Sequence, residues 1–374
     1  MGISKNFPQL TANSKRYGII EAKKPRRKKM GQIGMFDEEN RLEKLSAMGD
    51  SLEKLNSVIH WEMFRPLINR AYKRTASRAG GRPPFDHVMM FKILVLQRVY
   101  NLSDDQTEYQ INDRISFMRF LGLNMSDRIP DAKTIWLFRD TLTRSNIIRE
   151  LFDLFGKQLE KEHLITRVGT IVDATFVEAP RQRNTREENA KIKEGEIPEG
   201  WEKDAPKTQH KCRQKDTDAR WASKGGKRYY GYKNHIKADQ ESKLIEDYSV
   251  TAADVHDSTE IANLVNENDA VIYADSAYSG KTVAQKLPKT SELKICEKGY
   301  RYKPLTEEQR KNNHLKSKVR CRIEHIFGFM VGSMNGTSIR SIGRSRAAFN
   351  IGLTNLVYNM FRYELLRRNS VAVV

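Results

Sequence analysis

The chain has 374 residues, enough for two or three domains at about 150 residues each, and 39% of them are hydrophobic, which predicts a globular protein. It carries 66 Lys and Arg against 47 Asp and Glu, a formal net charge of +19, so nucleic acid is the expected partner. Neither a signal-peptide pattern nor a run of about 18 apolar residues occurs, which excludes secretion and membrane spanning and predicts a cytoplasmic, nucleoid-associated protein.

The charge alone leaves two other classes open, a ribosome-associated protein and a soluble basic protein without a nucleic-acid partner. The three cysteines, Cys212, Cys296 and Cys321, are widely separated and odd in number, which argues against a disulfide framework. A zinc site built from them with His210 or His325 is disfavoured, because no CxxC or HxxxH spacing is present.

Residues 1–50 are polar, with little apolar periodicity, and are predicted to form a mobile arm. The arm contains a basic run whose DNA-binding candidates are Arg26, Arg27, Lys28 and Lys29. These side chains are expected to lie along a phosphate backbone or in a minor groove. A solvated tail without a specific role is the alternative.

Residues 51–164 have the apolar spacing of helices and are predicted to form an all-α domain. A first helix starts near Leu52, and Asp86 caps a second that continues to Tyr100. Ser103, with a Gln three residues later, forms a capping box for a third, and Asp131 opens a fourth. A last helix of this region covers residues 146–163.

The third helix, a connector around Gly122 and the fourth helix have the order of a helix-turn-helix. In that arrangement Lys133, Thr134 and Arg139 would face the major groove and bind DNA. A purely structural helix pair is the alternative, since most short helix pairs in bundles bind nothing. Trp136 is expected in the core rather than in a base-stacking platform.

From residue 165 to 374 the pattern becomes α/β. Strands are predicted at 168–177, 228–238, 244–252, 270–274 and 293–297, and helices at 256–266, 316–330 and 346–368. This order predicts a ribonuclease H-like catalytic domain, a mixed five-stranded sheet with flanking helices. Residues 178–227 form a polar insertion with Trp201 and Trp221, which is expected either to grip DNA or to be a disordered surface loop.

Three carboxylates stand out in this domain. Asp173 lies in the middle of an apolar strand, where an unpaired carboxylate is costly, so it needs a metal or, alternatively, a structural Arg or Lys. Asp275 follows the strand 270–274, at an end where α/β sheets bind ligands, although a helix cap is its other possible role. Glu324 lies on a helix, with Arg320 four residues earlier to orient it.

Together these three carboxylates offer the oxygen ligands that Mg²⁺ prefers, and their mutual repulsion is relieved only by cations. Two Mg²⁺ ions about 3.5–4 Å apart would activate a water or a DNA 3′-hydroxyl and stabilise the leaving oxygen. Mn²⁺ is expected to substitute, because it accepts the same ligands. His256 stands at the start of the helix after the third strand and is expected near this site. Asp257 is a possible cap of that helix.

Several blocks of the sequence resemble the DDE transposases of the insertion-sequence-five superfamily. They occur in the family's order, at 169–175 (GTIVDAT), 230–235 (YGYKNH), 254–257 (DVHD), 274–278 (ADSAY) and 320–328 (RCRIEHIFG). Residues 80–142 are similar to the family's N-terminal helical domain, so the likeness runs from about Gly80 to the last helix.

The resemblance implies that Asp173, Asp275 and Glu324 are the catalytic, metal-binding triad. Around the glutamate the family has a Tyr, an Arg, the Glu and a Lys. Here Arg320 fits, but Ser317 replaces the Tyr and Val331 the Lys, so Lys318 is the expected substitute phosphate contact.

The function implied is an insertion-sequence transposase that binds the terminal inverted repeats of its element. It would nick DNA by Mg²⁺-dependent hydrolysis and join the freed 3′ ends to target DNA, as a homodimer because two ends are processed together. The alternatives are a ribonuclease H-like nuclease without strand transfer and a domesticated, non-catalytic DNA-binding protein.

Overall fold

The computed structural model describes residues 36–73, 83–199, 201, 214–278, 283, 285, 287–297, 299–300, 302 and 304–371. Contacts divide the chain into two units, Met1–Lys44 and Leu45–Val374. The arm candidates Arg26, Arg27, Lys28 and Lys29 lie outside the described residues. A helix, α1 (Asp37–Ala47), occupies the end of the predicted arm, and the acidic residues of its first turn are favourably placed for the helix dipole.

The described residues between Ser51 and Lys161 form helices joined by turns, as the sequence predicts. Asp86 accepts hydrogen bonds from the backbone of Val88 and Met89, and the capping box at Ser103 has both of its hydrogen bonds. The helices are α2 (Ser51–Val58), the 3₁₀ helix η1 (Trp61–Phe64), α3 (Arg65–Lys73), α4 (His87–Val99), α5 (Asp104–Asp113), α6 (Ile115–Leu121), α7 (Ala132–Arg144) and α8 (Ile148–Lys161).

Two expectations for this region need correction. The connector between α5 and α7 contains an additional helix, α6, which Gly122 ends in a left-handed conformation with φ 73°. Trp136 is expected in the core, but it is 41% exposed, because the buried stripe of α7 runs through Ile135, Phe138 and Leu142 instead.

Residues 165–374 contain one sheet, in which a sixth strand accompanies the five predicted ones. The strands are β1 (Thr170–Glu178), β2 (Arg220–Lys224), β3 (Lys227–Asp239), β4 (Ile245–Ala252), β5 (Val271–Ala274) and β6 (Glu292–Ile295). Their order is β2-β3-β1-β5-β6, and β4 pairs with the second half of β3. The pairing of β1 with β3 is antiparallel and that of β1 with β5 is parallel, so the sheet is mixed.

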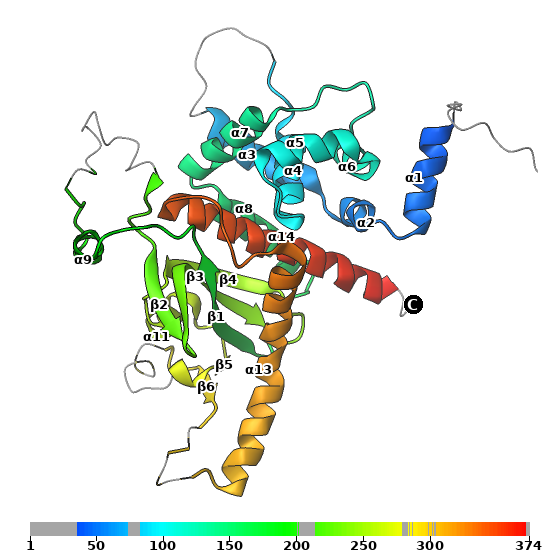
Figure 1. Cartoon of the computed structure of the whole chain (residues 1–374). Helices are drawn as coiled ribbons and strands as arrows, with labels where there is room; N and C mark the ends of the chain where they lie inside the picture. The colour runs from blue at the N-terminus through cyan, green and yellow to red at the C-terminus, as the bar shows by residue number, and fades with distance from the viewer. Residues whose placement is uncertain are drawn as a thin grey trace, which may run out of the picture. The chain divides into compact units, whose positions relative to one another are not determined.

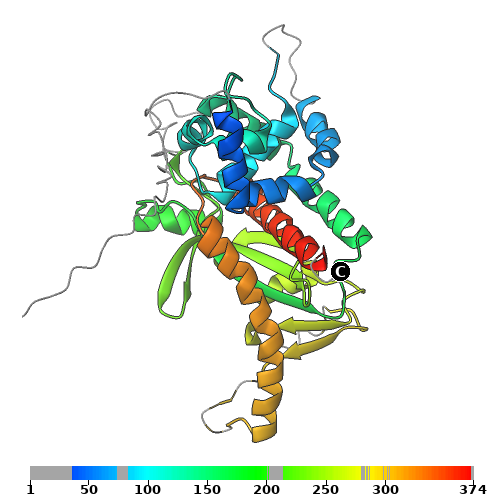
Figure 2. The ribbon, with the colours of Figure 1, turned by 90° about the vertical axis from the view of Figure 1, so that its right-hand side faces the viewer.

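Helices cover both faces of the sheet. Side chains alternate along a strand, so Ile171 joins the core shared with the helical region while its neighbour Val172 packs with Ile261 of α11 (Asp257–Leu264). On the first face, α14 (Arg344–Val371) lies between β4 and the helices α4 and α8 (Figure 1). The long helix α13 (Glu307–Met334) passes β1 and β5 and extends beyond β6 (Figure 2).

The polar insertion 178–227 is folded where the structure describes it. It contains α9 (Arg186–Glu194) and β2, and Trp201 is only 1% exposed, with its Nε1 donating to Glu188 at 3.1 Å. The buried carboxylate of Asp216 accepts from the Tyr232 hydroxyl at 2.8 Å and from the Gly343 backbone N–H at 3.0 Å. These hydrogen bonds attach the insertion to the sheet and to the start of α14, so a disordered loop is wrong for these residues.

Within the described residues, no helix is long and apolar enough to cross a membrane.

Candidate active site

Asp173 and Asp275 lie at the same level of the sheet. The parallel strands β1 and β5 pair Val172 with Ala274, and each aspartate is the next residue along its strand. Asp173 projects to the face that carries α13 and α14, because Val177, two alternations later, packs against Ile351 of α14. Both aspartates are partly buried, as expected at the edge of a site rather than in a core.

The electrostatics of Asp173 are those of a carboxylate in need of a cation. Burial raises the pKa of Asp173 above its usual value, and the backbone N–H of Ala174, Arg320 and Lys224 offset this only in part. The charge of Asp275 raises the same pKa further, which shows that the two carboxylates repel. Among ion pairs between described residues, none includes Asp173.

Arg320 pairs with the second aspartate. Its Nη1 lies 3.7 Å from a carboxylate oxygen of Asp275, with the two side chains 23% and 34% exposed. The Nε of Arg320 is buried and has no hydrogen-bond partner in the part of the chain that the structure describes. The expectation that Arg320 orients Glu324 is therefore corrected, because its ion pair reaches across to β5 rather than along its own helix.

Glu324 lies on α13, one turn beyond Arg320. The neighbouring Ile323 and the later Ile326 are buried in the core, whereas Glu324 is exposed. Arg322 projects elsewhere, as predicted, and donates to the backbone carbonyl of Gln240 at 2.8 Å. Within the described residues no three His, Cys, Asp or Glu side chains converge closely enough to form a ready metal cage. The structure thus brings Asp173 and Asp275 together and leaves Glu324 on the adjoining helix.

Two further residues of this site were not singled out from the sequence. Tyr278 is 1% exposed, and its buried hydroxyl has no hydrogen-bond partner among the residues that the structure describes. After burial, the carboxylates of Asp257, Asp173 and Asp275 raise its pKa above the usual value. Lys224, at the end of β2, is a cation that acts on Asp173. The ADSAY block contains Tyr278, but Lys224 belongs to a strand that the sequence did not reveal.

The DVHD block forms the start of α11. His256, rather than Asp257, is the cap, and its Nδ1 accepts from the Ser258 backbone N–H at 3.3 Å. Asp257 instead accepts a hydrogen bond from the Nζ of Lys233 at 2.8 Å. Asp257, not His256, is therefore the residue of this block that contributes to the electrostatics of Tyr278.

The predicted DNA-contacting residues lie in different settings. Lys133 and Lys318 are exposed, and Thr134 donates its backbone N–H to the cap Asp131 at 2.7 Å. Arg139 is held in a two-pronged ion pair with Asp104, with both nitrogens at 2.7 Å. Of these four, Lys133 and Lys318 present cations to solvent.

The sheet order, the acidic residues that lie level within β1 and directly after β5, and the helix that passes both strands define a ribonuclease H-like domain. Residues 165–360 match a family model described as "Transposase DDE domain", and residues 40–141 match one described as "Transposase domain (DUF772)". The chain therefore belongs to the DDE transposase family, and the resemblance seen in its sequence is confirmed.

One solved structure is similar to this chain. Its title is "Cryo-EM structure of piggyBac transposase synaptic complex with hairpin DNA (SNHP)". The two share 14% identity with a TM-score of 0.44, over 83% of this chain and 75% of the other.

Proposed function

We propose that this transposase serves an insertion sequence by binding the element's terminal inverted repeats, cleaving DNA there and joining the freed 3′ ends to target DNA. The observation that carries the proposal is the pair of neighbouring carboxylates that lie level on two parallel strands, Asp173 within β1 and Asp275 directly after β5. One of them, Asp173, is desolvated and has no ion-pair partner among the described residues. A desolvated carboxylate beside a second carboxylate is stabilised by a further cation or by a proton.

The donor set fits a divalent cation. Asp173 and Asp275 supply oxygen ligands from the sheet, and Glu324 supplies another from α13, as Mg²⁺ or Mn²⁺ prefers. Two such ions would neutralise charge on the scissile phosphate and favour deprotonation of the attacking hydroxyl. Glu324 is exposed, so its side chain is free to turn toward the aspartates without leaving a packed position.

The surrounding residues bind and orient the substrate in this proposal. Lys224 and Arg320 place positive charge beside the aspartates and attract a phosphodiester to them. The buried hydroxyl of Tyr278 has no partner within the described part of the chain, and it would donate a hydrogen bond to a phosphate oxygen or a bound water. Because two element ends must be processed together, we expect a homodimer on double-stranded DNA.

A cleavage and joining assay with the full chain tests the proposal. The substrate is a labelled duplex that ends in the inverted repeat flanking the reading frame, with supercoiled plasmid as target and Mg²⁺ or EDTA in parallel. We expect nicked and joined products in Mg²⁺ only, loss of both in Asp173→Asn, and retention in Asp113→Asn, which changes an exposed aspartate at the end of α5. Nicking without joining would identify a nuclease, and repeat binding without cleavage would identify a domesticated DNA-binding protein.

A further inference from the structure

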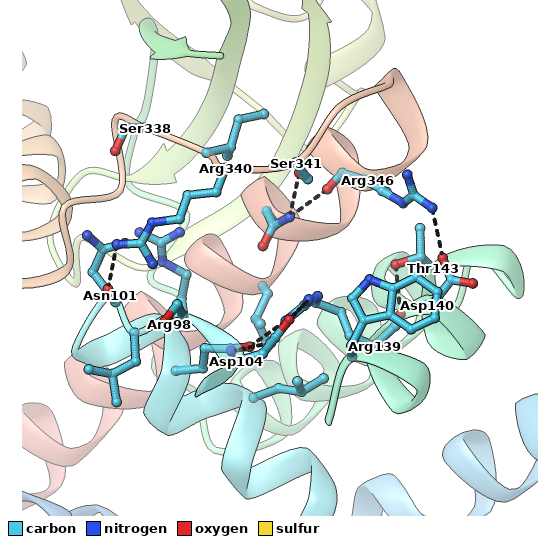
Figure 3. Close-up of a pocket in the computed structure, with 18 of the residues that line it drawn as sticks. Arg98, Asn101, Asp104, Arg139, Asp140, Thr143, Ser338, Arg340, Ser341 and Arg346 are labelled. Atoms are coloured by element: carbon cyan, nitrogen blue, oxygen red, sulfur yellow. Dashed lines mark hydrogen bonds and ion pairs between the residues drawn. The ribbon is translucent and has the colours of Figure 1, made fainter. Parts of the chain in front are cut away.

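A pocket of about 410 Å³ lies between helices of the N-terminal helical region and the elements that follow α13. It lies away from the acidic pair and is lined by α4, α5 and α7 on one side, and by residues 338–342 and α14 on the other. Four arginines and two aspartates line it, so the charged lining is positive. Figure 3 shows these side chains pointing into one space.

Two of the four arginines are neutralised by the two aspartates. Arg139 is paired with Asp104 at 2.7 Å, and Arg346 lies 3.2 Å from Asp140. The carboxylate of Asp140 is also shared with Arg144, which lies outside the pocket. The two aspartates therefore have no unpaired negative charge left to neutralise another arginine of the pocket. The excess positive charge therefore belongs to the remaining arginines, Arg98 and Arg340.

Arg98 is a buried guanidinium without a carboxylate partner among the described residues. It is 7% exposed, and its Nη2 donates to the carbonyls of Met334 at 2.6 Å and Asn335 at 3.0 Å, at the end of α13. Its Nε is buried and has no hydrogen-bond partner among those residues either. A buried cation with an unused donor is costly unless an anion joins it.

Arg340 brings a second positive charge to the same wall. Its Nη2 donates to the backbone carbonyl of Asn101 at 3.1 Å, and Figure 3 shows its side chain beside that of Arg98. Burial first, and then the charge of Arg340, lower the pKa of Arg98 to about 10. Within the described residues these two guanidinium groups repel each other and donate to neutral carbonyls, an arrangement that favours an anion.

We propose that Arg98 and Arg340 bind a backbone phosphate of the DNA duplex, at a position separate from the cleavage site. The choice of DNA as the ligand rests on the proposed function, because free nucleotides also carry the phosphate group that this site would bind. Duplex DNA is favoured because α7 lines the pocket with the exposed Trp136 and carries the exposed cation Lys133 one turn earlier, where a neighbouring phosphate of the same duplex can be bound. Arg98 also donates to the end of α13, so this side chain links the bound phosphate to the helix that carries Glu324.

The test is duplex binding measured by fluorescence anisotropy at several salt concentrations. Arg340→Gln is expected to weaken binding about tenfold, the loss of one charge-assisted hydrogen bond, and to flatten the slope of log K against log salt by about 0.9. The matched control is Arg367→Gln, which removes the same charge from an exposed arginine of α14, 3.7 Å from Glu162. Arg98→Lys, which keeps the charge but loses the fork, should show a smaller loss with the slope unchanged.

Thermal shift with inorganic pyrophosphate, against chloride at equal ionic strength, separates the two sources of phosphate. Stabilisation of the wild type that Arg340→Gln abolishes, together with weaker duplex binding, supports the proposal. Equal duplex binding by wild type and Arg340→Gln overturns it, and so does a pyrophosphate effect without any change in duplex binding. Cleavage by the wild type is measured separately. If the wild type cleaves DNA and Arg340→Gln binds duplex normally, phosphate binding in the pocket is refuted and the proposed transposase function is not affected.

Discussion

Removing the charges of Asp173, Asp275 and Glu324 one at a time separates a catalytic role from a structural one. The variants are Asp173→Asn, Asp275→Asn and Glu324→Gln. If the carboxylates hold metal, each change leaves the fold intact and lowers cleavage and joining by several orders of magnitude while repeat binding persists. If they are buried ion-pair partners, each change leaves a buried cation unpaired and lowers the free energy of unfolding by about 3–5 kcal/mol.

The structure sets a magnitude for each variant. The pair of Asp275 with Arg320 is 3.7 Å long and both side chains are partly exposed, so Asp275→Asn should cost at most about 1 kcal/mol. Glu324 is exposed, and Glu324→Gln should change stability by less than about 0.5 kcal/mol. Asp173→Asn removes a charge whose pKa burial raises, so the metal-free protein should be as stable as the wild type or more stable.

The gain for Asp173→Asn should depend on pH. A carboxyl whose pKa is raised in the folded state contributes stability below its ordinary value of 3.8 and loses that contribution as the pH rises. The variant should therefore melt above the wild type near pH 7, and the difference should shrink toward pH 4. The assays are thermal melting in EDTA and nicking of a repeat-end duplex in Mg²⁺ and Mn²⁺. Folded variants that nick at near wild-type rate would refute the assignment of the triad.

Three other predictions concern separate parts of the chain. Changing the four basic residues 26–29 to Ala should weaken binding to repeat and random duplexes alike and reduce the salt slope by about 0.9 for each phosphate that is no longer neutralised; an unchanged slope would show a passive tail. Lys133→Ala should lower the preference for repeat over random DNA by about 1–3 kcal/mol in competition binding if it reads bases. Arg139→Ala should also destabilise α7, because it leaves Asp104 without its ion pair. Burial raises the pKa of Glu246 to about 7. The contribution of its neutral form to stability is therefore complete below pH 4.5 and is lost as the pH rises through 7. Glu246→Gln should raise the free energy of unfolding at pH 8 by up to about 3 kcal/mol and leave it unchanged at pH 4. Lys237 does not lose its ion pair in this variant, because Asp269 lies 3.1 Å away. Equal gains at both pH values would contradict this prediction.

Sequence patterns predicted those elements that are stabilised by residues close to them in the sequence. The caps at Asp86, Ser103 and Asp131 depend on residues two or three positions away, and the structure contains all three. The strand β2 was missed because its neighbourhood is stabilised from a distance. Asp216 is anchored by Tyr232 and by Gly343, which is 127 residues away.

The same distinction applies to the site. In the structure Asp173 lies on the face of β1 that also carries Val177, which follows from the alternation of side chains along a strand alone. The partner of Arg320 was assigned from helical spacing, which considers a single helix, whereas the structure offers Asp275 from β5. The pairing of Arg98 with the end of α13 joins residues 236 apart in sequence and leaves no local signal.

The position of Glu324 is determined by contacts that do not include its own side chain. At its first half, α13 is attached to β6, where Lys316 donates to the Ile295 carbonyl at 2.9 Å. In its middle Arg322 donates to Gln240, and at its end Arg98 holds the carbonyl of Met334. Because these attachments remain when the carboxylate is replaced, α13 should keep its place in Glu324→Gln. Loss of cleavage in a variant that melts with the wild type would then reflect the missing carboxylate rather than a displaced helix.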